Sequence, residues 1–336
     1  MRVLHGMSEI AGQGINSVRG LRANGVNADM AAWRPNRFSY CTDISLNIGN
    51  NKLLYPWYAI KMFFFFIRAL CKYDCFHFHF LNSLLPYGLD LPLLKLFNKK
   101  IFFEFHGSEL RGKIRDIEYK YYHKAPKSKL QTFLINNACK YADGIILHDI
   151  ELKMHLPDIN VPVYIVPLRV DLSRFEPVFP DTNVEKPIVV HAPSNRNNKG
   201  TKWILAAAEK LKDDIDFILV ENKTQEEAIE VYTKSDIIID QITMGTYGVF
   251  SIEGMALGKP VLSYISKEIR ESFPDSCPIQ NIEPDTVYDV LKEVASDAKL
   301  RRELGIQGRK YVENYHDYIK NGKLLKDIYE GRLVND

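Results

Sequence analysis

The sequence predicts an α/β protein made of two doubly wound units, each a parallel sheet covered by helices. Short runs of β-branched and aromatic residues alternate with helix-length segments along the chain. This alternation is interrupted once, by a proline-bearing stretch without periodicity at 172–187. The length of 336 residues also suits about two domains rather than one.

Five strands are expected in the first half of the chain. They are MRVLHG (1–6), CFHFHF (75–80), KIFFEFH (100–106), GIILH (144–148) and VYIVP (163–167). Helices are expected to begin near Gly14, Tyr58, Pro92 and Thr132. This alternation predicts an N-terminal Rossmann-like domain over residues 1–175.

The second half repeats the same alternation. Strands are expected at IVVHAP (188–193), FILVE (217–221), IIIDQ (237–241) and PVLSY (260–264), with helices near Thr201, Gln225, Ser251 and Pro284. We therefore expect a C-terminal Rossmann-like domain at 185–315 and a final helix at 316–336. Ligands of such open sheets bind at the carboxyl ends of the strands, so the expected site is a cleft between the two domains.

Composition predicts a protein of a reducing compartment that has no nucleic-acid partner. The 44 basic and 42 acidic side chains nearly cancel, which predicts no nucleic-acid partner. The 5 cysteines are odd in number and scattered, as expected for reduced thiols in a cytosol. The N-terminus has no apolar region suited to export, so a cytoplasmic location is expected.

Two segments raise the question of membrane contact. The stretch from Trp57 to Leu70 is interrupted by Lys61 and Arg68 and is too short to cross a bilayer; a buried helix is the preferred interpretation and a membrane-contacting face is the alternative. The segment 111–129 carries an excess of Lys and Arg. It could meet an acidic membrane surface or a lipid-diphosphate-linked acceptor, or it could be a solvated face.

The first strand runs into a glycine-bearing loop with Gly12 and Gly14, followed by a helix. Glycines let backbone amides approach a ligand, and a helix N-terminus favours a phosphate. A plain strand-to-helix turn explains the same residues, because the third glycine of the dinucleotide fingerprint is missing.

Histidines end two of the predicted strands. His77 and His79 share one face of their strand, and the expectation is that His79 tops the strand while His77 is packed or hydrogen-bonded. No nearby carboxylate or cysteine is expected to complete a metal site with them. His106 follows an apolar strand and precedes Gly107, which leaves its ring facing the ligand edge of the sheet.

Polar residues at two corners of the second half suggest anion and ribose binding. Arg196 and Lys199 stand between a strand and a helix, as an anion clamp would, although a solvated polar loop is the alternative. Glu253 lies in an otherwise apolar helix, where a ribose diol could supply the donors that a buried carboxylate needs. Its alternative role is to cap its own helix.

Together these segments resemble the retaining glycosyltransferases of the large group 1 family, which have the GT-B fold and include many bacterial enzymes of surface-polysaccharide synthesis. The matching segments are Gly12 to Gly14, HGSE at 106–109, VPLRVDLSRFEP at 166–177, the Lys199–Gly200 corner, GVFSIEGMALGKPV at 248–261 and LGIQGRKYVENYHDY at 304–318. The resemblance implies a fold of two Rossmann-like domains facing a central cleft. It also implies that the domain at 1–175 is on the acceptor side, that the domain at 185–315 binds a nucleotide-sugar, and that the final helix at 316–336 returns to the first domain. It covers nearly the whole chain, and the last two segments are the most specific.

The resemblance also implies roles for particular residues. Lys199 and a nearby arginine would hold the donor diphosphate, Glu253 would bind the ribose, and His106 would lie at the reacting sugar. The donor-side set is Gly12, Gly14, Ser194, Arg196, Lys199, Tyr247, Gly248 and Glu253. The sequence departs from the family pattern in three ways: Gly245 replaces a glutamate, Ser194 stands at the usual arginine position, and Leu168 with Arg169 replaces an Asn-Gly pair.

The expected activity is transfer of a hexosyl or related sugar from a nucleoside diphosphate to a hydroxyl of a growing glycan or lipid-linked sugar. The resemblance implies retention of configuration. Because Lys199, Arg196 and backbone amides would stabilise the leaving diphosphate, no cofactor and no catalytic metal are expected. The rival hypotheses are a nucleotide-sugar epimerase of the same fold and a non-catalytic binding subunit.

Overall fold

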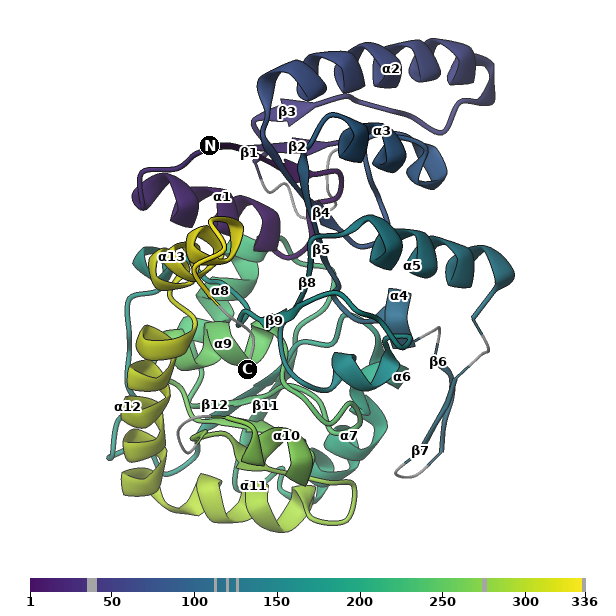
Figure 1. Cartoon of the computed structure of the whole chain (residues 1–336). Helices are drawn as coiled ribbons and strands as arrows, with labels where there is room; N and C mark the ends of the chain where they lie inside the picture. The colour runs from purple at the N-terminus through teal and green to yellow at the C-terminus, as the bar shows by residue number, and fades with distance from the viewer. Residues whose placement is uncertain (35–40, 112–113, 119–120, 125–126, 274–276, 334–336) are drawn as a thin grey trace. The chain divides into compact units, whose positions relative to one another are not determined.

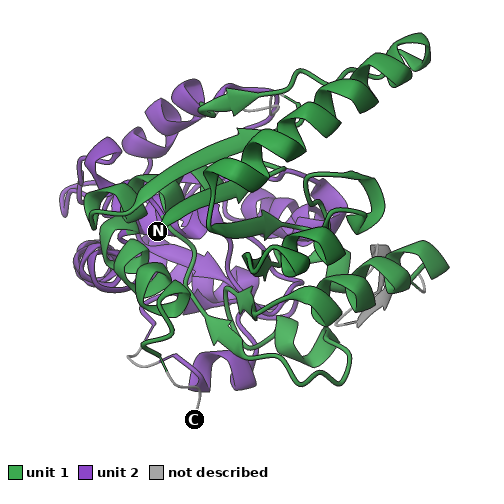
Figure 2. Ribbon diagram, turned by 45° about the horizontal axis from the view of Figure 1, so that its top comes forward, with its two compact units in different colours: residues 1–113, 125–169, 318–336 green, residues 114–124, 170–317 purple. Residues whose placement is uncertain are grey.

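The computed structural model describes residues 1–34, 41–111, 114–118, 121–124, 127–273 and 277–333. The chain forms two compact units, coloured separately in Figure 2. Unit 1 contains Met1–Lys113, Ala125–Arg169 and Tyr318–Asp336, and unit 2 contains Ile114–Lys124 and Val170–Asp317. Each unit has its own sheet and its own core.

Unit 1 is built on a seven-stranded parallel sheet in the order β3-β2-β1-β4-β5-β8-β9. The strands are β1 (Arg2–Gly6), β2 (Asn27–Ala32), β3 (Ile44–Ser45), β4 (Cys75–His79), β5 (Lys100–Glu104), β8 (Gly144–Leu147) and β9 (Val163–Ile165). Its helical segments are α1 (Gln13–Ala23), η1 (Lys52–Leu54), α2 (Tyr55–Lys72), η2 (Pro86–Gly88), α3 (Leu91–Leu96), α4 (Ser108–Arg111), α5 (Lys129–Tyr141), η3 (Leu152–His155) and α13 (Tyr318–Tyr329).

Helices cover both faces of this sheet, with α1 and α13 on one side and α2, α3 and α5 on the other (Figure 1). The alternation of strand side chains fits this division. Phe76 and Phe78 of β4 pack in the core with residues of α2, α3 and α5, whereas Cys75 packs with α1 and α13. His77 therefore points to the α1 and α13 side.

Unit 2 is built on a five-stranded parallel sheet in the order β11-β10-β12-β13-β14. The strands are β10 (Ile188–His191), β11 (Asp216–Leu219), β12 (Ile237–Ile239), β13 (Val261–Ser263) and β14 (Gln280–Asn281), and the unit also holds the hairpin β6 (Ile114–Glu118) and β7 (Tyr121–Lys124). Its helical segments are η4 (Leu172–Arg174), α6 (Arg196–Lys199), α7 (Thr201–Lys210), α8 (Gln225–Lys234), α9 (Val249–Ala256), α10 (Lys267–Glu271), α11 (Val287–Ser296) and α12 (Ala298–Tyr315).

All the strands expected from the sequence are present, but the structure adds several. The most important is β2, whose sequence NADMAA has low β propensity. It forms because Ala28 and Met30 are buried beside β1, so pairing and packing override local preference.

The expectation of a buried helix at Trp57 to Leu70 is wrong for the outward half of α2. Met62, Phe65, Phe66 and Ala69 are buried, but large apolar side chains on the opposite side are exposed. Among the described residues, Lys52–Lys72 is the one helix whose length and composition would allow it to cross a membrane, and 22% of its most apolar window is buried. Most side chains of the basic segment 111–129 lie outside the described residues.

Candidate functional site

The corner between α6 and α7 in unit 2 holds a compact ion pair. Lys199 ends α6, where Gly200 adopts a left-handed conformation with φ of 70° before α7 begins. The Lys199 Nζ lies 2.5 Å from Asp240 Oδ1, and the Asp240 side chain is completely buried. Burial alone would raise the pKa of Asp240, but the Lys199 ammonium and further hydrogen bonds lower it below its usual value.

Asp240 also occupies the N-terminus of α9. Its Oδ2 accepts hydrogen bonds from the Gly248 amide at 3.2 Å and from the Ser251 hydroxyl at 2.7 Å. A Cβ on Gly248 would lie 3.8 Å from Lys199 Nζ, so the predicted Lys199 and Gly248 are brought together. The sequence analysis missed Asp240, although an acid directly after three apolar strand residues was a signal for it.

Glu253 lies in α9 and is nine-tenths buried. Its Oε1 accepts a hydrogen bond of 3.1 Å from Gln225 Nε2, at the start of α8. Arg174 in turn donates to Gln225 Oε1 at 3.3 Å. Burial raises the pKa of Glu253 to about 7. Hydrogen bonds donated by a ligand would stabilise the ionised form of this carboxyl group.

The other predicted residues of unit 2 have varied surroundings. Arg196 and Ser194 are exposed, and both Nε and Nη2 of Arg196 donate to the Glu221 carboxylate at 2.8 and 2.5 Å. Tyr247 is buried, and its hydroxyl lies 2.9 Å from Tyr311 Oη and 3.0 Å from His316 Nε2. The Tyr247 hydroxyl is thus engaged inside the unit.

Gly245 adopts a left-handed conformation with φ of 74°. A Cβ there would meet neighbours only at ordinary contact distances, the shortest being 3.5 Å to Ser266 Cβ. A glutamate at this position would therefore fit sterically but would strain the backbone.

The N-terminus of α1 already faces a carboxylate of the chain. Glu9 Oε2 accepts a hydrogen bond of 2.7 Å from the Ile15 amide, and a Cβ on Gly14 would lie only 2.8 Å from this oxygen. Gly12 is the N-cap residue, with φ of 78°. Burial raises the pKa of Glu9 to about 7 against the effect of these backbone amides. A phosphate that used the amides near Gly12 and Gly14 would have to displace Glu9.

His106 belongs to a hydrogen-bonded histidine chain in unit 1. In order, the chain runs His148, His106, His79, His5, Tyr329, His77 and Glu104. Successive ring nitrogens of its first four members lie 2.9, 3.0 and 3.1 Å apart, His5 Nε2 lies 3.2 Å from the Tyr329 hydroxyl, and His77 Nε2 lies 2.9 Å from Glu104 Oε2. We call these seven residues the histidine chain.

Glu104 determines which group donates and which accepts in each contact of the histidine chain. It is completely buried and accepts a hydrogen bond from Arg169, and this guanidinium holds the pKa of Glu104 well below its usual value although burial opposes the shift. The contact between His77 Nε2 and Glu104 Oε2 lacks hydrogen-bond geometry, but at 2.9 Å a ring N–H beside the carboxylate is electrostatically favoured over a bare lone pair. His77 therefore carries its proton on Nε2 and accepts from Tyr329 at Nδ1. The same logic, carried back along the chain, gives His106 an Nε2–H that donates to His79 and an Nδ1 that accepts from His148.

All histidines of the chain are uncharged near neutral pH. Burial lowers the pKa of His79 to about 3 and that of His148 to about 4, and it lowers the pKa of His5, His77 and His106 as well. Both ring nitrogens of His106 are therefore committed to neighbouring rings. A hydrogen bond from His106 to a sugar would require one of these contacts to open.

The expectation that no carboxylate lies near His77 and His79 is wrong. The register of the sheet places Glu104 of β5 beside His79 of β4, and the carboxylate lies 2.9 Å from His77. The sets His5, His77, His79 and His79, Glu104, His106 each bring three ligand atoms within 4.8 Å, close enough to hold a metal ion. A divalent ion there would break the histidine chain and sit beside the Arg169 guanidinium, which is electrostatically unfavourable.

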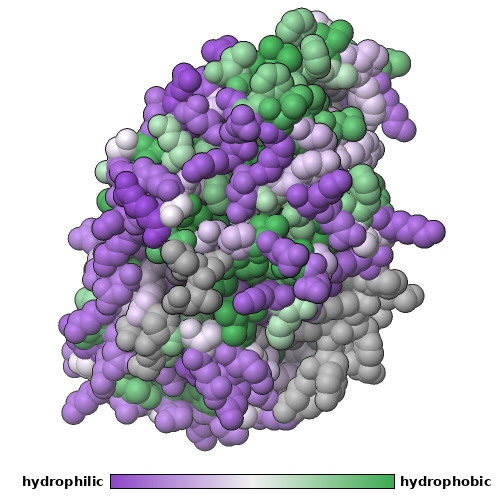
Figure 3. Space-filling view, viewed as in Figure 1, coloured by the Kyte–Doolittle hydropathy of each residue, from purple (hydrophilic) through white to green (hydrophobic). Residues whose placement is uncertain are grey.

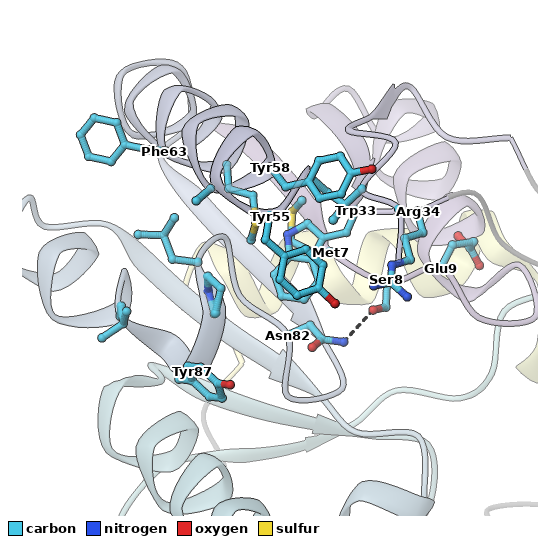
Figure 4. Close-up of a pocket in the computed structure, with 17 residues that line it drawn as sticks. Met7, Ser8, Glu9, Trp33, Arg34, Tyr55, Tyr58, Phe63, Asn82 and Tyr87 are labelled. Atoms are coloured by element: carbon cyan, nitrogen blue, oxygen red, sulfur yellow. Dashed lines mark hydrogen bonds between the residues drawn. The ribbon is translucent and has the colours of Figure 1, made fainter. Parts of the chain in front are cut away.

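Unit 1 also contains a pocket of about 1000 Å³, shown in Figure 4. Its walls come from the loop after β1, from the segment after β4 and from one side of α2. The lining residues are Met7, Ser8, Glu9, Trp33, Arg34, Ile48, Gly49, Tyr55, Tyr58, Ala59, Met62, Phe63, Asn82, Leu85, Pro86, Tyr87 and Leu89. The sequence analysis missed this pocket because its residues are scattered over the first 89 positions and carry no motif.

Comparison with known proteins gives a match in structure alone. No protein-family model matches the chain, and no curated protein matches it in sequence. Sucrose-phosphate synthase from Thermosynechococcus elongatus superposes with a TM-score of 0.69 at 16% identity, over 98% of both chains. HepE from Anabaena, in complex with UDP and glucose, superposes with a TM-score of 0.67 at 11% identity, over 98% of this chain and 100% of that one.

A third similar structure is the apo form of the lipopolysaccharide outer core galactosyltransferase WaaB. It superposes with a TM-score of 0.61 at 12% identity, over 99% of this chain and 100% of that one. Together with the two parallel sheets and their interleaved helices, this similarity confirms the predicted α/β class and the GT-B fold.

Proposed function

We propose that this chain, which has the GT-B fold, is a glycosyltransferase that moves a sugar from a nucleoside-diphosphate sugar to a hydroxyl acceptor. The supporting observation is the site around Lys199 in unit 2. A fixed cation, the start of α9 and a buried glutamate gather near the carboxyl ends of β10 and β12, where ligands of open parallel sheets bind.

In this proposal the donor diphosphate replaces Asp240 as the partner of Lys199. The ammonium and the amides at the start of α9 then face the oxygens that gain charge as the glycosidic bond breaks. Arg196 adds a second cation once it leaves Glu221. Glu253 accepts from the ribose hydroxyls in place of Gln225.

The stereochemical outcome we propose is retention, with the departing phosphate assisting deprotonation of the acceptor hydroxyl. His106 would steady the sugar after one of its two ring contacts opens. The protein would act in the cytoplasm. It would need no catalytic metal, because its own cations stabilise the leaving group.

Binding and turnover of sugar nucleotides test this function. HepE is described in complex with UDP-glucose, so UDP-glucose is the first donor to try, followed by GDP and ADP sugars. We expect saturable binding and release of the nucleoside diphosphate, abolished by Lys199→Gln and retained by the exposed control Lys202→Gln.

Two outcomes would favour other functions. Conversion of the sugar nucleotide to an isomer without an acceptor would indicate an epimerase. Saturable binding with no turnover on any acceptor would indicate a non-catalytic binding subunit.

A further inference from the structure

The outer side of α2 and its preceding turn exposes a continuous row of large apolar residues. Leu53, Trp57, Ile60, Phe64 and Ile67 recur every three or four positions and therefore share one side of the helix. Leu53 is 88% exposed, Phe64 is 68% exposed and Trp57 is 57% exposed. We call these five residues the outer row. In Figure 3 apolar atoms gather over this helix at the top of the molecule.

Exposure of the outer row to water is energetically unfavourable. A surface helix in water has polar side chains opposite its buried stripe, whereas α2 is apolar on both sides. Apolar patches of this kind mark interaction sites.

The charges on this helix point to one kind of partner. From Lys52 to Lys72 the sequence contains no acidic residue, and the exposed Lys52 and Arg68 flank the outer row. Aromatic and aliphatic side chains bordered by cations match the boundary of an anionic bilayer, where apolar groups enter the acyl region and cations meet headgroups. A second copy of the same surface would bring these like charges together.

The pocket of unit 1 adjoins the other flank of α2. Tyr55, Tyr58, Ala59 and Phe63 of α2 line it, and Leu89 lies among the residues of the opposite wall. Phe63 and Leu89 are themselves exposed, so the apolar wall of the pocket continues onto the surface beside the outer row.

Polar side chains line the same pocket. Tyr55 and Tyr58 of α2 each carry a hydroxyl among the lining residues (Figure 4). Ser8 and Asn82, joined by a hydrogen bond of 2.8 Å, add two more polar side chains. Hydroxyl and amide groups can both donate and accept, as the binding of a hydroxyl-bearing ligand requires.

We propose that the pocket binds the saccharide end of an amphiphilic, lipid-linked acceptor, and that the outer row docks unit 1 on the anionic membrane from which this acceptor comes. Tyr55 and Asn82 would bind sugar hydroxyls, and the lipid would leave the pocket past Phe63 and Leu89. The description of this ligand as an acceptor rests on the proposed transferase function. Binding of the ligand and docking on the membrane do not require that function.

Vesicle sedimentation tests the docking surface. We expect the full chain to pellet with phosphatidylcholine vesicles that contain phosphatidylglycerol, and less with pure phosphatidylcholine. Trp57→Glu with Phe64→Glu should weaken this binding roughly tenfold or more, because two apolar contacts become charges repelled by the anionic lipid. Met154→Glu, at a residue 72% exposed in unit 1 but outside α2, is the matched control and should bind as the parent does.

Either of two results would overturn the docking surface. One is a parent chain that stays in solution with anionic vesicles at low salt. The other is equal pelleting of the double variant and the parent. A lipid-free dimer that the double variant converts to monomer would assign the outer row to a second copy instead.

An amphiphilic probe tests the pocket. We would titrate n-octyl β-glucoside below its micelle concentration into a Trp57→Phe, Trp203→Phe background, so that Trp33 is the remaining indole. We expect a saturable change in Trp33 fluorescence that glucose alone does not give. Ala59→Phe should abolish the change by placing a ring where the octyl chain would lie, and Asn82→Ala should weaken binding several-fold by removing an amide from the lining.

The exposed Asn136→Ala is the control for the Asn82 variant and should leave the titration unchanged. Equal responses to octyl glucoside and to glucose, or a response that survives Ala59→Phe, would refute the pocket assignment. Lys199→Gln should leave vesicle and octyl glucoside binding intact while it abolishes UDP-glucose binding. The acceptor proposal and the transferase proposal can therefore fail separately.

Discussion

Buried neutral histidines couple the stability of unit 1 to pH. The pKa of His79 is lowered to about 3 and that of His148 to about 4 by burial, whereas an unfolded histidine titrates near its ordinary value of about 6.5. Below that value the unfolded chain binds protons that the native chain does not, so stability falls as the pH falls. Each such histidine costs about 1.4 kcal/mol per pH unit in this window.

We therefore expect the melting temperature to drop steeply between pH 6.5 and pH 4.5, measured by circular dichroism in buffers of constant ionic strength. His148→Gln should make the slope shallower, because one titrating group is lost. Lys202→Gln, at an exposed residue that does not titrate in this range, should leave it unchanged. A melting temperature that stays constant across this pH range would contradict the assignment of uncharged histidines to the histidine chain.

The buried carboxylate of Glu253 provides a second test at this scale. Glu253→Ala should weaken nucleotide binding by about 1.5–3 kcal/mol, the range for a hydrogen bond to a charged group. Isothermal titration with UDP and UDP-glucose measures the change. Glu226→Ala, at an exposed residue of α8, is the control. An unchanged affinity in Glu253→Ala would remove the ribose role.

Sequence reasoning finds residues that sit in motifs and misses those defined by their partners. Lys199 and Glu253 stand in recognisable segments. Asp240 and Glu104 do not, and Arg169 is noticed only as a departure from the family pattern. Each of the three acquires its role from a side chain on another strand or loop. The charged residue inside the apolar strand KIFFEFH was the available clue to Glu104.

At the scale of elements, α1 and α13 pack with their backbones in contact at two glycines. A Cβ on Gly20 would lie 2.1 Å from the Tyr318 carbonyl oxygen, and a Cβ on Gly322 would lie 2.2 Å from the Gly20 carbonyl carbon. Gly20→Ala should destabilise the protein by roughly 1–3 kcal/mol, despite the better helix propensity of alanine, because neither backbone can yield.

Urea unfolding measures this loss. Lys323→Ala, at an exposed position of α13, should change the free energy of unfolding by less than about 0.5 kcal/mol. Greater stability in Gly20→Ala than in the parent chain would mean that the helices separate without cost.

The elements that sequence predicted best are those whose burial and local preference agree. β8 and β12 are continuous apolar runs, and α8 begins with a Thr224–Glu227 capping box that can be read directly. The exposure of α2 could not be predicted, because a helix that is apolar all round looks the same whether its second side meets protein or lipid.

At the scale of the whole molecule, two units with separate sheets carry different parts of the proposed reaction. The proposed leaving-group stabilisation relies on Lys199 and Arg196 rather than on a metal ion. We expect transfer measured in excess EDTA to stay within about twofold of the untreated rate, since protein cations supply the charge. Loss of activity that Mg²⁺ restores would assign metal binding to a carboxylate such as Asp240.

The assignment of α13 to unit 1 has a consequence for biosynthesis. Tyr329 donates to His77 and accepts from His5, so two buried rings of the first sheet depend on a hydroxyl that lies 252 and 324 residues further along the chain. On the ribosome, β1 and β4 emerge long before this phenol exists. Unit 1 can thus complete its hydrogen bonding only after the segment Val170–Asp317 of unit 2 has been translated, and a nascent chain arrested before residue 318 would hold these imidazoles without their partner.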